Sequence, residues 1–98
     1  MIIEAAQITV AEGQQSQFEA ALSRAIEILS MAHGYLGIEV HRGVERPAVY
    51  LLTIHWETLA DHTEGFRGSE LFTQWRALIG PFFAEPPLVE HWERLVER

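Results

Sequence analysis

The segment VYLLTIHW, residues 49–56, is the most apolar stretch of the chain and has apolar side chains at both alternations of a strand. Because successive side chains of a strand point to opposite faces, one face would carry Tyr50, Leu52, Ile54 and Trp56. The other face would carry Val49 and Leu51. A strand that is apolar on both faces is expected at the centre of a sheet, and both faces of that sheet then need a cover.

The first half of the chain reads as a strand, a helix and a second strand. Alternation in residues 2–10 predicts a strand with one face formed by Ile2, Ala6, Ile8 and Val10. Apolar residues at helical spacing predict an amphipathic helix over residues 16–32, and Gly34 is expected to end it in a left-handed conformation. Residues 35–43 predict a second strand, which the short turn before residue 49 joins into a β-hairpin. Its apolar face would carry Leu36, Ile38 and Val40.

The segment after residue 56 reads as two short helices. Thr58 and Asp61 have the spacing of a capping box, with Asp in place of the preferred Glu, and predict the start of the first helix. Gly65 and Gly68 interrupt it, and Ser69 is expected to cap the second helix. The apolar stripe of this second helix consists of Leu71, Phe72, Trp75, Leu78 and Ile79.

Gly80-Pro81 ends the second helix, and residues 88–96 alternate well enough to predict a last strand, with a helix as the alternative. The resulting order is β-α-β-β-α-β, the ferredoxin-like arrangement of an α+β domain. Two helices then cover one face of a four-stranded antiparallel sheet, and residues 1–98 form a single domain. Another copy of the chain is the simplest cover for the second apolar face, so we predict a homodimer.

Composition excludes several classes of function. The 98 residues include thirteen glutamates, one aspartate and seven arginines, with no lysine and no cysteine, and carry a net charge of −7. These absences exclude Schiff-base chemistry, disulfides and thiolate sites. The negative field disfavours nucleic acid and anionic membranes as partners. No apolar run approaches the ~20 residues of a membrane span, and the N-terminus lacks the basic region of a signal peptide, so a cytoplasmic location is expected.

Five histidines are the first candidates for chemistry: His33, His41, His55, His62 and His91. We expect His41 and His55 on neighbouring strands, on the sheet face of Glu39 and Thr53, where His91 could join them from the edge. Imidazole and carboxylate groups can bind a divalent metal, but no tight ligand spacing supports a metal site. Hydrogen-bonded histidines at a dimer interface are the more frequent arrangement, so no metal is expected.

The remaining candidates lie in residues 55–76. His62 faces solvent, caps a helix end, or points into a cavity between helix and sheet. Arg76 is either a surface side chain that covers Trp75 or a group that orients an anionic oxygen. The aromatic rings of this region either fill a core or form the walls of a pocket for a flat apolar ligand. They are Trp56, Phe66, Phe72 and Trp75, with Phe82 and Phe83 shortly after them.

The stretches HWETLADH, GSELFTQW and EPPLVEHW resemble the antibiotic biosynthesis monooxygenase superfamily. The shared features are a strand that ends in aromatic–Trp–Glu or a variant of it, a short acidic helix, and Ser-x-x-Phe at the start of a second helix. The resemblance covers nearly the whole chain. It implies a ferredoxin-like dimer in which two sheets form a shared α/β barrel, with a pocket between sheet and helices in each subunit.

Many proteins that this chain resembles oxidise phenolic or quinol-type substrates with dioxygen and no metal or flavin. The deprotonated substrate supplies the electron, and the protein supplies orientation, a base and a dry cavity. Other branches degrade haem with an asparagine, a tryptophan and an axial histidine. These positions fall here at Ala6 or Gln7, at Phe66 and at Arg76, so haem degradation is disfavoured and no cofactor is expected.

The resemblance therefore implies a cofactor-independent monooxygenase that oxidises a small aromatic, quinol or polyketide-like metabolite. In this hypothesis His62 is the base or proton shuttle, and Arg76 stabilises the developing oxyanion. The pocket walls are Trp56, Phe66, Phe72 and Trp75. A non-catalytic ligand-binding or sensing dimer, or an enzyme that only abstracts a proton, is the alternative on the same fold. An open pocket beside His62 or Arg76 favours an enzyme, and an interior filled by rings favours the binding module.

Overall fold

The computed structural model describes residues 1–98, and its elements follow the predicted order. The strands are β1 (Ile2–Thr9), β2 (Tyr35–Arg42), β3 (Val49–Trp56) and β4 (Leu88–Trp92). The helices are α1 (Gln15–Leu29) and α2 (Glu70–Ile79), with a π-helical turn η1 (Asp61–Phe66) before α2 and a 3-10 turn η2 (Gly80–Phe82) after it. Neither helix combines the length and apolar character of a membrane span.

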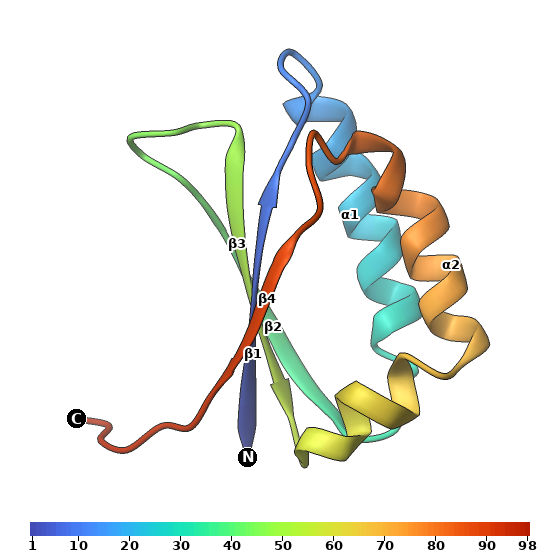
Figure 1. The fold of residues 1–98 in the computed structure, drawn as a ribbon, viewed down its shortest axis with the longest axis vertical. Helices are drawn as coiled ribbons and strands as arrows, with labels where there is room; N and C mark the ends of the chain where they lie inside the picture. Colours follow the sequence, from blue (N-terminus) through green and yellow to red (C-terminus); the bar gives the residue numbers. More distant parts are fainter.

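The four strands form one antiparallel sheet in the order β2-β3-β1-β4. Both helices lie on the same side of this sheet, as Figure 1 shows. The predicted ferredoxin-like α+β fold is therefore confirmed. Strand β3 lies inside the sheet, between β1 and β2, as its apolar faces indicate.

The hydrophobic core lies between the helices and the inner face of the sheet. The four β3 residues on this face, at positions 50, 52, 54 and 56, are at most 2% exposed. Helix α1 contributes an apolar stripe that is almost fully buried, formed by Phe18, Leu22, Ala25 and Leu29. Burial of one such side chain contributes roughly 1.5–3 kcal/mol, so this interface holds the helices on the sheet.

Local geometry differs from the predictions at three places. Helix α1 ends three residues before position 32, and Gly34 takes the predicted left-handed conformation, with φ of +84°. Strand β4 forms, but it ends at Trp92 rather than at residue 96. Strand β2 has an irregularity between Tyr35 and Gly37, so Tyr35 packs on the inner face and Leu36 is 55% exposed. The placement of Leu36 on the face of Ile38 is therefore wrong.

The outer face of the sheet has no cover within the chain. Leu51 is 39% exposed there, and Leu88 and Trp92 are each 56% exposed. The C-terminal residues 93–98 extend away from the domain, as Figure 1 shows, and Leu95 in this tail is 91% exposed. The chain thus leaves a second apolar face open, as the pattern of residues 49–56 predicts.

Candidate functional site

The candidate site is built on the turn between β3 and α2. Thr58 and Asp61 form the predicted capping box: the Asp61 N–H donates to Thr58 Oγ1 at 3.1 Å, and the Thr58 N–H donates to Asp61 Oδ2 at 3.2 Å. The next turn is π-helical, and the Arg67 N–H donates to the His62 carbonyl at 3.1 Å. Such turns are rare and frequent at functional sites. This one places His62 and Phe66 against the sheet, both buried.

The junction between η1 and α2 depends on two small residues. Gly68 donates its N–H to the Glu64 carbonyl at 3.0 Å, and a Cβ at position 68 would lie 2.8 Å from that oxygen. Ser69 precedes α2 as predicted, but its side chain caps no N–H of the helix. The predicted side-chain cap is wrong because the Ser69 hydroxyl donates to the Phe66 carbonyl at 2.7 Å.

A polar cluster lies under this turn, and we call Glu4, Trp56, His62 and His91 the acid–imidazole cluster. The Trp56 Nε1–H donates to Glu4 Oε1 at 2.9 Å, and His62 Nε2 lies 3.3 Å from the same oxygen. His62 Nδ1 forms a hydrogen bond with His91 Nε2 at 2.8 Å. The His62 ring stacks on Trp56 with centroids 5.4 Å apart. Both polar side chains at its centre are buried, Glu4 at 6% and His62 at 2% exposed.

Strand register brings the members of this cluster together. Glu4 pairs with Ile54 on β3 and with His91 on β4, so its side chain joins the inner face of the sheet. His91 therefore faces the helices. His91 thus does not join His41 and His55, which the sequence left open, because the phase of β4 turns its side chain to the inner face.

Burial sets the protonation states of the cluster. It raises the pKa of Glu4 above the ordinary 4.5, although the Trp56 hydrogen bond and the Arg67 charge act in the opposite direction. Burial lowers the pKa of His62 from 6.5 to about 4, and the charges of Arg67 and His91 lower it as well. The pKa of His91 is also lowered, by burial and by Arg67. Both imidazoles are therefore neutral at neutral pH.

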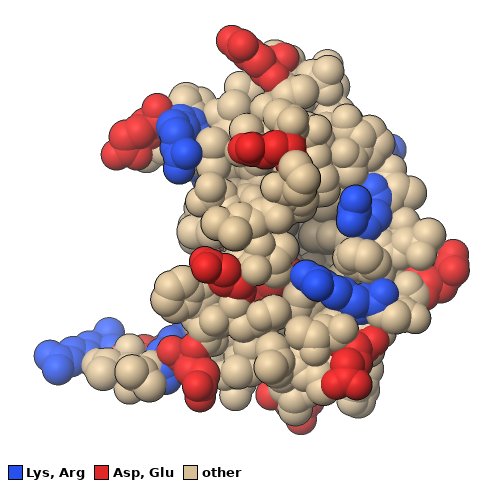
Figure 2. Space-filling view, in the orientation of Figure 1, with Lys and Arg blue, Asp and Glu red and all other residues tan.

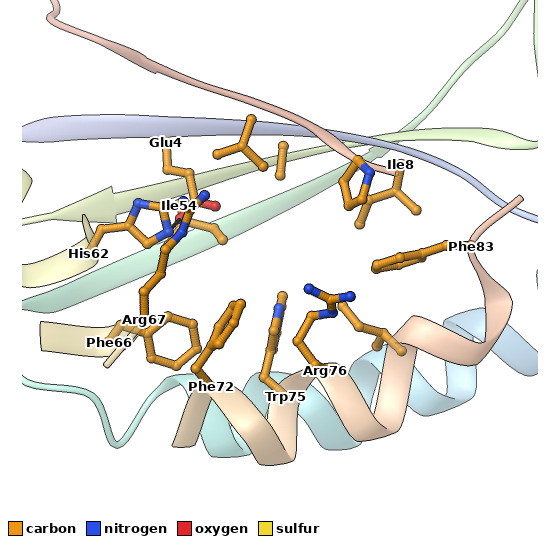
Figure 3. A pocket seen from close by; sticks show the side chains of 14 residues that line it. Glu4, Ile8, Ile54, His62, Phe66, Arg67, Phe72, Trp75, Arg76 and Phe83 are labelled. Atoms are coloured by element: carbon orange, nitrogen blue, oxygen red, sulfur yellow. Dashed lines mark ion pairs between the residues drawn. The ribbon is translucent and has the colours of Figure 1, made fainter. Parts of the chain in front are cut away.

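A pocket of about 420 Å³ opens beside the cluster, between the inner face of the sheet and α2. Figure 2 shows a hollow on this side of the molecule with blue cationic side chains at its rim. Figure 3 shows Glu4 and His62 at one end of the pocket, with Arg76 and Phe83 farther along it. Most of the lining is apolar; the polar or charged lining residues are Glu4, His62, Arg67 and Arg76.

The two arginines give this pocket a local positive charge in an acidic chain. The Arg76 guanidinium carbon lies 5.9 Å from the ring centroids of both Phe72 and Phe83, a cation–π geometry that holds the group at the pocket. Its aromatic neighbours are these two rings rather than Trp75. Neither Arg67 nor Arg76 forms an ion pair with an acidic side chain of the protein. Both remain available to an anionic ligand group.

The structure brings most of the predicted site residues to this pocket, while their roles stay predictions. The lining includes His62, Phe66, Phe72, Trp75 and Arg76. Trp56 does not line it, which corrects the prediction of a pocket wall: this ring is fully buried beneath His62, and its N–H is directed to Glu4. Phe83, one of the clustered aromatic rings in the sequence, also lines it, whereas sequence reasoning missed Glu4 and Arg67. The one available signal was a glutamate at an inward alternation of β1.

The predicted polar patch on the outer face of the sheet is present without His91. His41 Nε2 lies 3.2 Å from Thr53 Oγ1, and Thr53 donates to Glu39 Oε1 at 3.1 Å. His55 Nε2 lies 3.7 Å from the same carboxylate. No group of three histidine, aspartate or glutamate side chains is placed to hold a metal ion.

Comparison with known proteins identifies related chains. A family model described as antibiotic biosynthesis monooxygenase matches residues 1–78. The uncharacterized protein YczJ of Bacillus subtilis (strain 168) is 42% identical over 93 residues, which cover 95% of this chain and 98% of YczJ.

Solved structures of the same fold agree with this family match. A Bordetella bronchiseptica protein that bears the same family name superposes with a TM-score of 0.94 at 40% identity, with 97% of each chain covered. SnoaB from Streptomyces nogalater, described as a cofactor-independent oxygenase, superposes with a TM-score of 0.82. At 10% identity, over 98% of this chain and 94% of SnoaB, that likeness concerns the fold alone.

Proposed function

The chain belongs to the antibiotic biosynthesis monooxygenase family, and from this premise we propose that it oxidises a small aromatic, quinol or polyketide-like metabolite with dioxygen and no cofactor. The observation that carries the proposal is the pocket, an open cavity with aromatic walls that ends in a buried carboxylate beside an imidazole. SnoaB, a cofactor-independent oxygenase by description, supports it at the level of the fold. A ligand-sensing module is less well supported, because the interior beside His62 and Arg76 is open rather than filled by rings.

The proposed reaction converts an activated CH2 group and O2 into a carbonyl group and water. A base removes one C–H proton, and the electron pair stays on the substrate as an enolate. The enolate gives one electron to O2, and the resulting radical pair forms a C–O bond and a peroxide anion. The peroxide takes up a proton; loss of the second C–H proton and cleavage of the O–O bond then release water. In this proposal Arg76 stabilises the anionic oxygens, and the apolar walls exclude water.

The test is oxygen consumption by the purified protein with anthrone as substrate. The double variant His62→Ala, Arg76→Ala removes an imidazole and a cation from the pocket, so we expect uptake to fall by about 100-fold or more. Arg24→Ala, which removes an exposed arginine from α1, is the matched control. Uptake unchanged in the double variant would reject both assignments, and ligand binding without uptake would favour the sensing module.

We also propose that the protein is a cytoplasmic homodimer in which the open sheet face packs on a second copy. The support is the exposed Leu51, Leu88 and Trp92 on that face, together with the exposed Leu95 and Val96 of the C-terminal tail. A short chain buries a limited core, so a second copy also supplies burial that one domain lacks.

Sedimentation measures this association. Leu51→Glu places a charge at the centre of the open face, and two copies would bring like charges together. We expect its dimer dissociation constant to rise by at least about tenfold. Ala20→Glu is the control, because Ala20 is exposed on α1, which lies on the opposite side of the sheet (Figure 1). A wild-type protein that stays monomeric at micromolar concentration contradicts the proposal.

A further inference from the structure

We propose that Glu4 is the group that takes the proton from the bound substrate, and that His62 and His91 form the path along which this proton moves to and from solvent. The inference deepens the proposed function and rests on it, because it names the proton acceptor of the same pocket. His62, the base expected from the sequence, becomes a relay between the carboxylate and the second imidazole.

The geometry of Glu4 leaves one of its carboxylate oxygens to a ligand. Glu4 is the one acidic side chain that lines the pocket, and its Oε1 accepts the Trp56 N–H at 2.9 Å. Its Oε2 has no hydrogen-bond partner in the protein. No fully buried side-chain oxygen or nitrogen lacks such a partner, so Oε2 opens onto the pocket. Trp56 thus holds one oxygen in place and leaves the other available to a ligand in the pocket.

His62 is placed to exchange a proton with Glu4 rather than to work alone. Its Nε2 lies 3.3 Å from Glu4 Oε1 and makes no other polar contact. Its Nδ1 is engaged by His91 Nε2 at 2.8 Å. Since both imidazoles are neutral, one of these two nitrogens donates and the other accepts, so the direction of this hydrogen bond fixes the tautomer of His62. His91 is only partly buried on edge strand β4, and it ends the path toward solvent.

The relative basicity of Glu4 and His62 agrees with Glu4 as the proton acceptor and His62 as the relay. Burial raises the pKa of Glu4, while burial and the neighbouring charges bring the pKa of His62 down to about 4. An imidazole with so low a pKa is a weak base, whereas a carboxylate with a raised pKa is a stronger base than usual. Arg67 is the cation that acts on all three groups, and it lies on the rim of the same pocket.

The proton steps balance as follows. The substrate C–H bond breaks, its electron pair stays on the substrate, and an O–H bond forms at Glu4 Oε2. Rotation of the carboxyl group then exchanges its two oxygens, so that the O–H lies beside His62 Nε2 and the other oxygen accepts the Trp56 N–H. In the tautomer with the proton on Nδ1, His62 accepts the Glu4 proton at Nε2 and passes its Nδ1 proton to His91 Nε2. His91 then releases its own Nδ1 proton to water. Reversal of these steps returns a proton to the peroxide anion, so the path needs no other proton donor.

Proton removal can be measured without the oxygen step. Anthrone incubated with the protein in D2O without oxygen exchanges its CH2 protons for deuterium, and NMR follows the rate above buffer. We expect Glu4→Gln, which keeps an oxygen acceptor for Trp56, to lower the rate by about 100-fold or more. Glu57→Gln removes the same charge from an exposed site and leaves the rate unchanged. Circular dichroism confirms that each variant is folded.

The relay is tested with His91→Ala, which leaves room for free imidazole. We expect this variant to lose most of the exchange rate and to regain it when imidazole is added, which a purely structural role of His91 would not produce. Equal exchange in Glu4→Gln and wild type, or no exchange by wild type, overturns the inference.

A measurement on the ligand-free protein separates this inference from the proposed function. NMR of the Glu4 carboxyl carbon and the imidazole nitrogens during acidification should show that Glu4 takes up a proton before His62 does. The reverse order overturns the inference. If anthrone exchanges protons but no oxygen is consumed, the monooxygenase proposal fails and the role of Glu4 stands. If Glu4→Gln consumes oxygen at the wild-type rate, the role of Glu4 is rejected and the monooxygenase proposal stands.

Discussion

Acid should destabilise the protein, because the buried His62 takes up a proton less readily in the fold than in the unfolded chain. A substitution of His62 should remove this loss of stability. The pKa of His62 is 6.5 in the unfolded chain and about 4 in the fold. Between these values the unfolded chain binds a proton at this site and the folded protein does not. Stability is therefore fully present above pH 6.5 and is lost as the pH falls to about 4. At 1.36 kcal/mol for each pKa unit, the loss amounts to about 3 kcal/mol.

Urea denaturation at a fixed protein concentration measures this loss, because a dimer would make stability depend on concentration. The variant His62→Gln cannot take up the proton. Its stability relative to wild type should therefore improve by about 3 kcal/mol between pH 6.5 and 4. Phe66→Leu is the control, because it alters the same packed region without a titrating group and should give a constant difference. A His62→Gln difference that stays constant, or that worsens in acid, would refute the reasoning.

Three further predictions concern the same region. Burial raises the pKa of Glu4, so its ionised form opposes folding at a pH above that pKa. Glu4→Gln should therefore stabilise the protein at neutral pH and stabilise it less in acid, which urea denaturation measures. Trp56→Phe removes the N–H donor to Glu4 and should cost about 1–3 kcal/mol at neutral pH in the same assay. Gly34→Ala combines a left-handed backbone with a Cβ that overlaps the Asp61 side chain, so its melting temperature should fall, by about 4–8 °C for each kcal/mol lost.

The fold could be predicted mainly because the spacing of apolar residues identifies each strand and helix and the face that it buries. The pattern of residues 49–56 defines a strand with two apolar faces, and the structure places one of those faces under the helices. Helix α1 is equally predictable, since its apolar stripe from Phe18 to Leu29 has helical spacing. The irregularity near Leu36 had one marker, Gly37, because an isolated glycine within a strand is typical of a bulge, but the alternation alone did not predict it.

The site was only partly predictable, because it depends on register and on an unusual turn. Glu4 has the inward alternation of β1 in the sequence, but only the β1–β3 pairing places it beside Trp56. His91 joins the site only if β4 has one of two phases, and the alternation of residues 88–96 does not select between them. His62 points inward because η1 is π-helical, whereas ordinary helical spacing left its direction open.

The central claim is that the protein incorporates oxygen from O2 into a substrate bound in this pocket, after Glu4 has removed a proton from that substrate. Mass spectrometry of the product formed from anthrone under ¹⁸O2, with the pure protein and no added cofactor, tests it most directly. The account predicts one ¹⁸O atom in the new carbonyl group, with product formation lost in Glu4→Gln and retained in Glu57→Gln. Product without the label, or a labelled product formed equally well by Glu4→Gln, would contradict it.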